Sequence, residues 1–256
     1  MVPIRTPPSS NLVKLCVDLG PPELDGYETS DAVLCNARCA TDDARWADAA
    51  NPPLTALSTR RMWRGDQLVP MFEAGVSLDR WCKPLNPFVP LTRKWGRGEL
   101  GKWGPNHAAD PIVTTDTSTP GLKSLLLIRR LSGKLALPGG MVDAGESYTT
   151  TLAREIEEEA VHSSKTLRHA LGHGTIVFTG FVDDPRTTNN AWIETVAVHA
   201  HLTPFEASAI KLRAAVHGET LESGWFDATD SLLDGLHADH GRIVRLALNA
   251  MHPRAV

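Results

Sequence analysis

A glycine pair followed by a strongly acidic helix constrains the fold of this chain more than any other segment. Residues 137–161 read LPGGMVDAGESYTTTLAREIEEEAV, and four glutamates fall within the five residues EIEEE. Carboxylates three or four residues apart on a helix repel each other by roughly 0.2–0.5 kcal/mol per pair. A helix of this composition therefore needs positive charge nearby, from the protein or from a ligand.

The glutamates of this segment are not spread evenly around the predicted helix. At about 100° per residue, Glu155, Glu158 and Glu159 share an arc of about 100°, and Glu157 lies on the other side. The arc borders an apolar stripe formed by Leu152, Ala153, Ile156 and Ala160. Arg154 can pair with Glu158 four residues later, so two carboxylates are expected to lack a partner. This pattern favours a site for Mg²⁺, which binds a few carboxylates together with phosphate oxygens.

The loop before the helix contributes further candidate residues. Gly139 and Gly140 carry no side chain, so they allow close approach of the backbone and set the geometry in which the helix begins. Glu146 lies in the same loop and is placed to reach the same metal ions. Taken alone, the acidic run favours a solvated helix face that holds one i,i+4 ion pair, and only the longer pattern around it favours a metal site.

The rest of the chain predicts an α/β (α+β) protein in two parts. Residues 1–120 hold most of the 18 prolines and five of the seven tryptophans, which predicts a smaller strand- and loop-rich subdomain that closes over the substrate. Beyond residue 120, the patterns predict strands over 123–130, 174–184, 191–202 and 220–230, and helices over 147–161 and 237–251. This order indicates a mixed sheet sandwiched between helices in residues 121–256.

Charge and hydropathy exclude several classes of function. The 26 basic and 30 acidic residues give a net charge of −4, so neither a nucleic-acid partner nor direct membrane contact is expected. No apolar run approaches the roughly 18 residues that span a bilayer. The first residues lack the apolar core of a secretory signal, which favours a cytoplasmic protein, with mitochondria as the second choice. The four cysteines form no C-x-x-C pair and are expected to be reduced thiols.

The acidic segment is similar to the Nudix box. The matching positions are Gly140, Glu146, Arg154, Glu155, Ile156, Glu158 and Glu159. The resemblance implies the Nudix fold and hydrolysis of a nucleoside diphosphate linked to another group. It makes Glu155, Glu158 and Glu159 ligands of Mg²⁺, for which Mn²⁺ can substitute, and it gives Arg154 and Glu146 supporting roles. Val161 and His162 depart from the family pattern, which often has glycine and an aliphatic residue there.

Other stretches resemble one Nudix branch, which contains ADP-ribose pyrophosphatases and the C-terminal ADP-ribose-binding domain of TRP-melastatin cation channels. They are GRGELGKWGPNHAADPIVT (96–114), FVDDPRTTNNAWIETVAV (181–198) and, more weakly, RWADAANPP (45–53). The resemblance implies that Asp184 and Arg186 contact the terminal ribose or phosphates, that Asn106 lies near the diphosphate, and that His240 contacts the ligand. Thr115 and Asp116 stand where this branch commonly has Arg-Trp.

The implied activity is Mg²⁺-dependent hydrolysis of ADP-ribose to AMP and ribose 5-phosphate. The chain is then either a free enzyme or an enzymatic domain whose partner is the rest of a tetrameric, ADP-ribose-gated channel. A non-hydrolysing sensing domain, and a hydrolase of another nucleoside diphosphate derivative, remain alternatives. His199 and His201 alternate on one strand face and are interpreted as partly exposed, not as a metal pair, while Trp192 and Trp225 are expected in the core.

Overall fold

The computed structural model describes residues 48, 54–79, 82–91, 94–213 and 220–251. Most of the 45–53 stretch and three of the four cysteines therefore lie outside the described residues. The chain divides into two compact units, Met1–Asn106 with Gly180–Glu194, and His107–Thr179 with Thr195–Val256. The boundary expected near residue 120 stays a prediction.

The first unit contains a small two-stranded sheet, in agreement with the strand-rich N-terminal part predicted from the sequence. Helix α3 (Leu54–Ser58) precedes strands β1 (Arg61–Arg64) and β2 (Gln67–Pro70), which pair in antiparallel fashion, and a short 3₁₀ helix, η1, covers Gly98–Leu100. Its core consists of Leu57, Met62, Met71, Val76, Trp103 and Trp192. Trp192 is fully buried, which confirms the prediction that it is a core residue.

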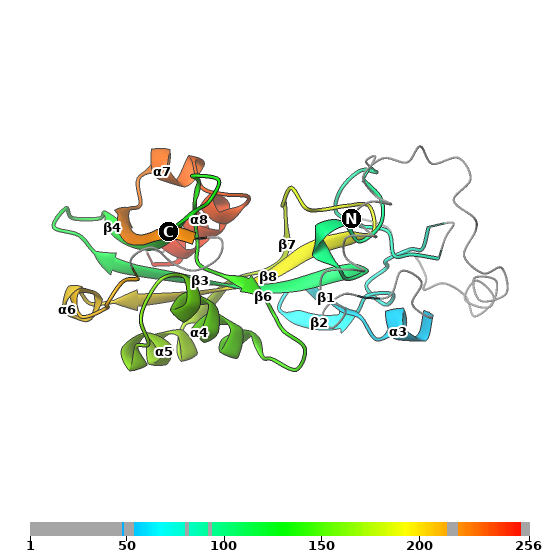
Figure 1. Cartoon of the computed structure of the whole chain (residues 1–256), viewed down its shortest axis with the longest axis horizontal. Coiled ribbons are helices and arrows are strands. Elements are labelled where there is room, and N and C mark those ends of the chain that lie inside the picture. Colours follow the sequence, from blue (N-terminus) through cyan, green and yellow to red (C-terminus); the bar gives the residue numbers. More distant parts are fainter. Residues whose placement is uncertain (1–47, 49–53, 80–81, 92–93, 214–219, 252–256) are drawn as a thin grey trace, which may run out of the picture. The chain divides into compact units, whose positions relative to one another are not determined.

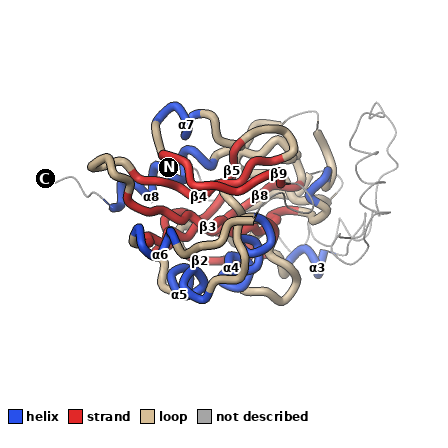
Figure 2. Tube along the Cα trace, turned by 60° about the vertical axis from the view of Figure 1, so that its left-hand side comes forward, coloured by secondary structure: helices blue, strands red, loops and turns tan. Residues whose placement is uncertain are grey.

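A mixed seven-stranded sheet forms the framework of the fold (Figure 2). Its strands are β3 (Gly104–Asp116), β4 (Lys123–Arg130), β5 (Leu135–Ala136), β6 (Gly140–Met141), β7 (Thr175–Val182), β8 (Ala191–Leu202) and β9 (Thr220–Asp227). The order is β5-β4-β3-β8-β7, while β6 pairs with β3 and β9 pairs with β4. The pairing of Ala109 with Gly140 brings the glycine loop onto the middle of β3.

Helices cover both faces of the sheet in the second unit. Figure 1 shows α4 (Tyr148–Glu159) and α5 (Lys165–Gly172) on one face, and α7 (Asp230–Asp234) and α8 (His240–Met251) on the other. Helix α6 (Pro204–Ser208) follows β8. The α/β architecture predicted from the sequence is therefore confirmed, and none of the described helices has the length and apolar character needed to cross a membrane.

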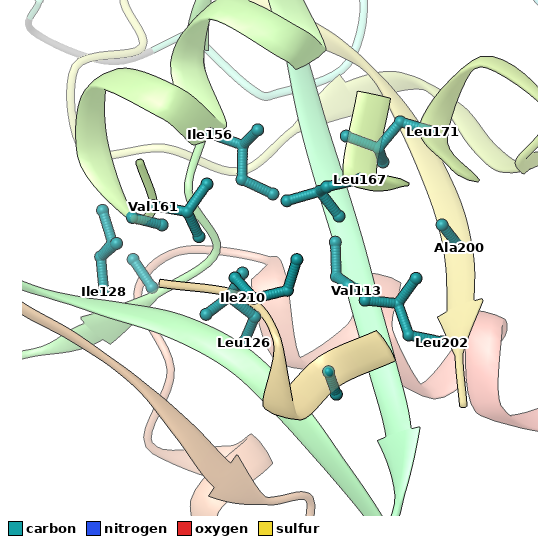
Figure 3. Packing of buried hydrophobic residues seen from close by; sticks show 13 residues of the cluster. Val113, Leu126, Ile128, Ile156, Val161, Leu167, Leu171, Ala200, Leu202 and Ile210 are labelled. Atoms are coloured by element: carbon teal, nitrogen blue, oxygen red, sulfur yellow. The ribbon is translucent and has the colours of Figure 1, made fainter. Parts of the chain in front are cut away.

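The core of the second unit lies between the sheet and the pair α4 and α5 (Figure 3). It contains Val113, Leu126, Ile128, Ala136, Ile156, Ala160, Val161, Leu167, Leu171, Ala200, Leu202, Ala207 and Ile210. Ile156 and Leu152 are fully buried, as the predicted apolar stripe of the acidic helix requires. Trp225, expected in the core, is partly buried against this cluster.

Several local expectations are wrong. Residues 104–116 form one long strand and not short strands and loops, and α5 was not predicted. His199 is buried and shares the Thr114 hydroxyl with His201, at 2.8 and 2.9 Å, so the interpretation of a partly exposed pair fails for His199. Cys82 is disulfide-bonded, so the expectation of reduced thiols is wrong at this position.

Candidate active site

The acidic helix begins at a well-formed cap. The side chain of Ser147, the N-cap residue of α4, accepts a hydrogen bond from the Thr150 N–H at 3.2 Å. Such caps satisfy one of the free N–H groups at the start of a helix. The predicted helix over 147–161 is thus confirmed as Tyr148–Glu159, and its register places Leu152 and Ile156 in the core.

Arg154 is the centre of the carboxylate cluster on α4. Its guanidinium donates to both oxygens of Glu146, at 3.0 and 3.1 Å. Its Nη1 lies 2.6 Å from Glu155 Oε1 and 3.3 Å from Glu158 Oε2. The expectation that Glu155 would lack a protein partner is therefore wrong, because one guanidinium serves three carboxylates. Glu157 pairs instead with Arg168 on α5, which confirms its place on another side of the helix.

The loop is locked to the helix through the same arginine. Nη2 of Arg154 donates to the Met141 carbonyl at 3.1 Å and lies 3.9 Å from Asp143 Oδ2. Glu146 also accepts a hydrogen bond from the Thr151 hydroxyl at 2.8 Å. These contacts hold the segment between the glycine pair and the helix in one conformation. The sequence pattern indicated Glu146 but gave no signal for the Met141 carbonyl.

The protein shifts the pKa values of Glu146 and Glu155 in opposite directions. The hydrogen bonds from Arg154 lower the pKa of Glu146 to about 2. Burial raises the pKa of Glu155 above its ordinary value, against the opposing effect of Arg154. The side chain of Glu155 is 11% exposed, whereas that of Glu158 is 59% exposed. A nearby cation would therefore offset the effect of burial and stabilise the charged form of Glu155.

The glycine pair is in direct contact with these carboxylates. A Cβ added at Gly140 would lie 2.5 Å from Glu155 Cδ and 2.7 Å from its Oε2. The Gly139 N–H donates to Glu159 Oε2 at 3.0 Å, so Glu159 also has a partner. Only glycine fits at 140 without displacing Glu155, which gives a steric reason for the pair.

His240 and the glycine loop also meet in the second unit. The Leu137 N–H donates to His240 Nδ1 at 2.9 Å, and His240 is 9% exposed. The neighbouring His237 ring lies edge-on to it, with ring centroids 5.8 Å apart. His240 therefore helps to hold the start of the glycine loop through Leu137. The predicted contact between His240 and a ligand stays a prediction.

Three predicted ligand contacts belong to the first unit. Arg186 donates from Nε and Nη2 to the carboxylate of Asp184, at 2.8 and 3.0 Å, and Asp184 is buried. Asn106 is buried as well, and its amide donates to the carbonyls of Lys102 and Gly104 at 3.0 and 3.1 Å. The ligand roles of these residues stay predictions.

The carboxylates suit a hard divalent cation by their chemistry. Oxygen ligands from a few carboxylates are what Mg²⁺ and Mn²⁺ prefer. Within residues 48, 54–79, 82–91, 94–213 and 220–251, however, no three acidic, histidine or cysteine side chains are arranged to hold a metal ion as they stand. Glu155 and Glu158 each bond Arg154 through one carboxylate oxygen, Oε1 and Oε2 respectively, so a cation would be held through the other oxygen of each.

Comparison with known proteins assigns the family. The model of the NUDIX domain matches residues 105–247. A mitochondrial ADP-ribose pyrophosphatase of Rattus norvegicus is 38% identical over 196 residues, which cover 64% of this chain and 53% of that protein. The transient receptor potential cation channel subfamily M member 2 of Mus musculus is 40% identical over 138 residues, covering 50% of this chain and 9% of the channel. The chain thus spans about half of the pyrophosphatase and a small part of the channel.

Among solved structures, the NUDIX domain of Shewanella oneidensis NrtR complexed with ADP ribose is 19% identical. The match covers 57% of this chain and 88% of that one, with a TM-score of 0.44. The family model covers more than half of the sequence and includes the whole carboxylate cluster around Arg154. The chain therefore belongs to the Nudix family and is related to ADP-ribose pyrophosphatases.

Proposed function

We propose that this protein hydrolyses ADP-ribose to AMP and ribose 5-phosphate in the presence of Mg²⁺ or Mn²⁺. The observation that carries the proposal is the cluster in which Arg154 bonds Glu146, Glu155 and Glu158, with Glu155 packed against Gly140. The choice of ADP-ribose is supported by the relationship to the rat pyrophosphatase over 64% of the chain.

Glu155, Glu158 and Glu159 would hold the cation. When bound, the ion offsets the charge of the diphosphate and lowers the pKa of a bound water. Arg154 would keep its two hydrogen bonds to Glu146 with the ion bound, because Glu146 is not among the proposed ligands. The guanidinium therefore keeps its place and continues to orient the carboxylates on either side of it.

The reaction adds one water molecule across the P–O–P linkage. One phosphorus gains the water oxygen, the other leaves with the bridging oxygen, and the protons of water pass to the solvent and the products. The two products are then two phosphate monoesters, AMP and ribose 5-phosphate. Asp184, Arg186 and Asn106 are proposed as ligand contacts on the basis of the sequence resemblance, because Arg offers a fork of donors to phosphate or ribose oxygens.

A second candidate is an ADP-ribose-binding module of a larger cation channel. It is favoured by the match to the mouse channel protein, which is 40% identical over half of this chain. The two functions are compatible, because a binding module can retain hydrolysis. An experiment distinguishes the two functions, because a pure binding module would bind ADP-ribose without releasing AMP in Mg²⁺.

Substrate choice is tested with a panel of diphosphates at saturating Mg²⁺. ADP-ribose, NADH, diadenosine tetraphosphate and UDP-glucose are compared by kcat/KM, and products are separated by chromatography. We expect ADP-ribose to be the best of the four and AMP to be its nucleotide product. If UDP-glucose or diadenosine tetraphosphate is the better substrate, the assignment to ADP-ribose is wrong while the hydrolase assignment stands.

A further inference from the structure

Asp110 is a buried carboxylate on β3 for which the proposed reaction has so far no role. It is 7% exposed, and its Oδ2 accepts a hydrogen bond of 2.7 Å from the hydroxyl of Thr195 on β8. Thr195 is fully buried. Because a carboxylate is costly to remove from water, a buried one is usually held by specific partners and marks a position where its charge or shape matters.

The other oxygen of Asp110 lies against the glycine pair. A Cβ built at Gly139 would overlap Asp110 Oδ1, and it would lie 2.8 Å from the Ala109 carbonyl oxygen and 3.2 Å from Asp110 Cα. Gly139 has a φ of 151°, a conformation that side chains rarely adopt. Strand β3 therefore encloses one side of the Gly139 peptide through its backbone and through Asp110.

The N–H of Gly139 points to the acidic helix. The N–H of Gly139 donates to Glu159 Oε2 at 3.0 Å, and the carboxylate of Glu155 packs against Gly140. Gly139 thus lies between a carboxylate from β3 and a carboxylate from α4. Any change in the orientation of this peptide changes the direction of the hydrogen bond that Glu159 accepts.

We propose that Asp110, anchored by Thr195, is a positioning residue for the hydrolytic site. It fixes the Gly139 peptide so that its N–H holds the Glu159 carboxylate in one orientation. This inference rests on the proposed function, in which Glu159 is one of the residues that hold the cation. Partners of metal-binding side chains commonly change affinity or activity by about 10–100-fold when they are replaced.

The test compares Asp110→Asn, Thr195→Val and Thr195→Ser with Thr114→Val. Thr114 is a matched control, because it is also a fully buried threonine with a bonded hydroxyl, and it lies on β3 itself. The first measurement is hydrogen exchange of the Gly139 amide by NMR in metal-free protein. The second is the rate of ADP-ribose hydrolysis as a function of Mg²⁺ concentration, with kcat and KM determined separately.

Asp110→Asn and Thr195→Val are expected to speed exchange of the Gly139 amide by about tenfold relative to the parent. They should also raise the Mg²⁺ concentration for half-maximal rate by about tenfold, with a smaller effect on the KM for ADP-ribose. Thr195→Ser, which keeps the hydroxyl, should recover both values. Thr114→Val should leave both near those of the parent, after correction for any change in stability.

Parent values for both measurements in Asp110→Asn and Thr195→Val would overturn the inference. An equal change in Thr114→Val would overturn it as well, since the effect would then be a general loosening of β3. If Asp110→Asn does not fold, Thr195→Val carries the test. Should the parent protein not hydrolyse ADP-ribose, the proposed function fails, and the exchange of the Gly139 amide still decides whether Asp110 orients it.

Discussion

Arg154 and Glu146 form a two-pronged ion pair, with the guanidinium Nε and Nη2 at 3.1 and 3.0 Å from the two carboxylate oxygens. The pair joins the middle of α4 to the loop that precedes it. Because the remaining nitrogen of Arg154 contacts Glu155 and Glu158, the loop and the proposed cation-binding carboxylates depend on one side chain. This dependence answers how a helix accepts the sequence EIEEE: Arg154 offsets Glu155 and Glu158, Glu159 accepts from a backbone N–H, and Glu157 pairs elsewhere.

The first prediction concerns the carboxylates themselves. Replacing both Glu155 and Glu158 by glutamine is expected to reduce kcat for ADP-ribose by at least about 100-fold, because the charges that hold the cation are lost. Binding of ADP-ribose, measured by calorimetry, should remain detectable. Turnover at the parent rate would show that these carboxylates do not hold the metal.

Replacement of Arg154 by lysine tests the ion pairs that this side chain makes with Glu146, Glu155 and Glu158. A lysine ammonium cannot bond both oxygens of Glu146 and two further carboxylates at once, so we expect kcat/KM to fall by about tenfold or more. The matched control is Arg168→Lys, which alters the similar fork between Arg168 on α5 and Glu157 on α4. Equal losses in the two variants would mean that helix stability, and not the site, is responsible.

Substitution of Gly140 by alanine tests the close approach of the loop to Glu155. The added methyl group would lie 2.5 Å from Glu155 Cδ, so the carboxylate must move. A displacement of this kind is expected to cost about 100-fold in kcat/KM. Gly172→Ala is the control, since an added Cβ there meets nothing within 4 Å. Full activity of Gly140→Ala would argue against the described position of Glu155.

Because His199 is buried, we expect the free energy of unfolding to depend on pH. Burial, together with the positive charges of His201 and Lys123, lowers the pKa of His199 from its ordinary value near 6.5 to about 4. Because the unfolded chain takes up a proton near pH 6.5 and the folded one does not, stability is complete above pH 6.5. It is lost as pH falls toward 4, by up to about 3 kcal/mol.

The measurement is urea unfolding of the parent and of His199→Asn between pH 4 and 7.5. Groups facing His199 and its neighbour include Asp116, which is ion-paired with both Lys123 and His201. Asp116 is present in both proteins, so the difference between the two curves reports His199. An unchanged slope between pH 6.5 and 4 in the variant would contradict the buried, neutral state of this histidine.

The sequence predicted the acidic helix and its register because the apolar residues recur there with the period of a helix. Leu152 and Ile156 are buried, and the predicted arc of three glutamates corresponds to the side that meets Arg154 and the glycine pair. Strand β3 was missed because GPNHAADPIVTTD contains turn-forming residues and shows no alternation. Twelve of its thirteen residues, all but Asp116, are buried or half-buried. Polar and apolar residues therefore do not alternate along it as they do in a strand with one solvent-exposed face.

The candidate site was only partly predictable for the same kind of reason. Spacing along one helix identifies Arg154, Glu155 and Glu158, since their contacts are local. Asp110 and Thr195 are 85 residues apart, and their hydrogen bond depends on where the two strands lie in the sheet. No pattern in a single sequence reports such a pairing, and the same holds for His240 and Leu137, which are 103 residues apart.

The metal-dependent hydrolysis proposed for these carboxylates is tested most directly by incubating the parent protein with ADP-ribose in Mg²⁺ and, in parallel, in EDTA, while AMP release is followed by chromatography. We predict equal amounts of AMP and ribose 5-phosphate in Mg²⁺ and no release above the uncatalysed rate in EDTA. Equal release in Mg²⁺ and EDTA, or no release in either Mg²⁺ or Mn²⁺, would contradict the claim that these carboxylates act by holding a divalent cation.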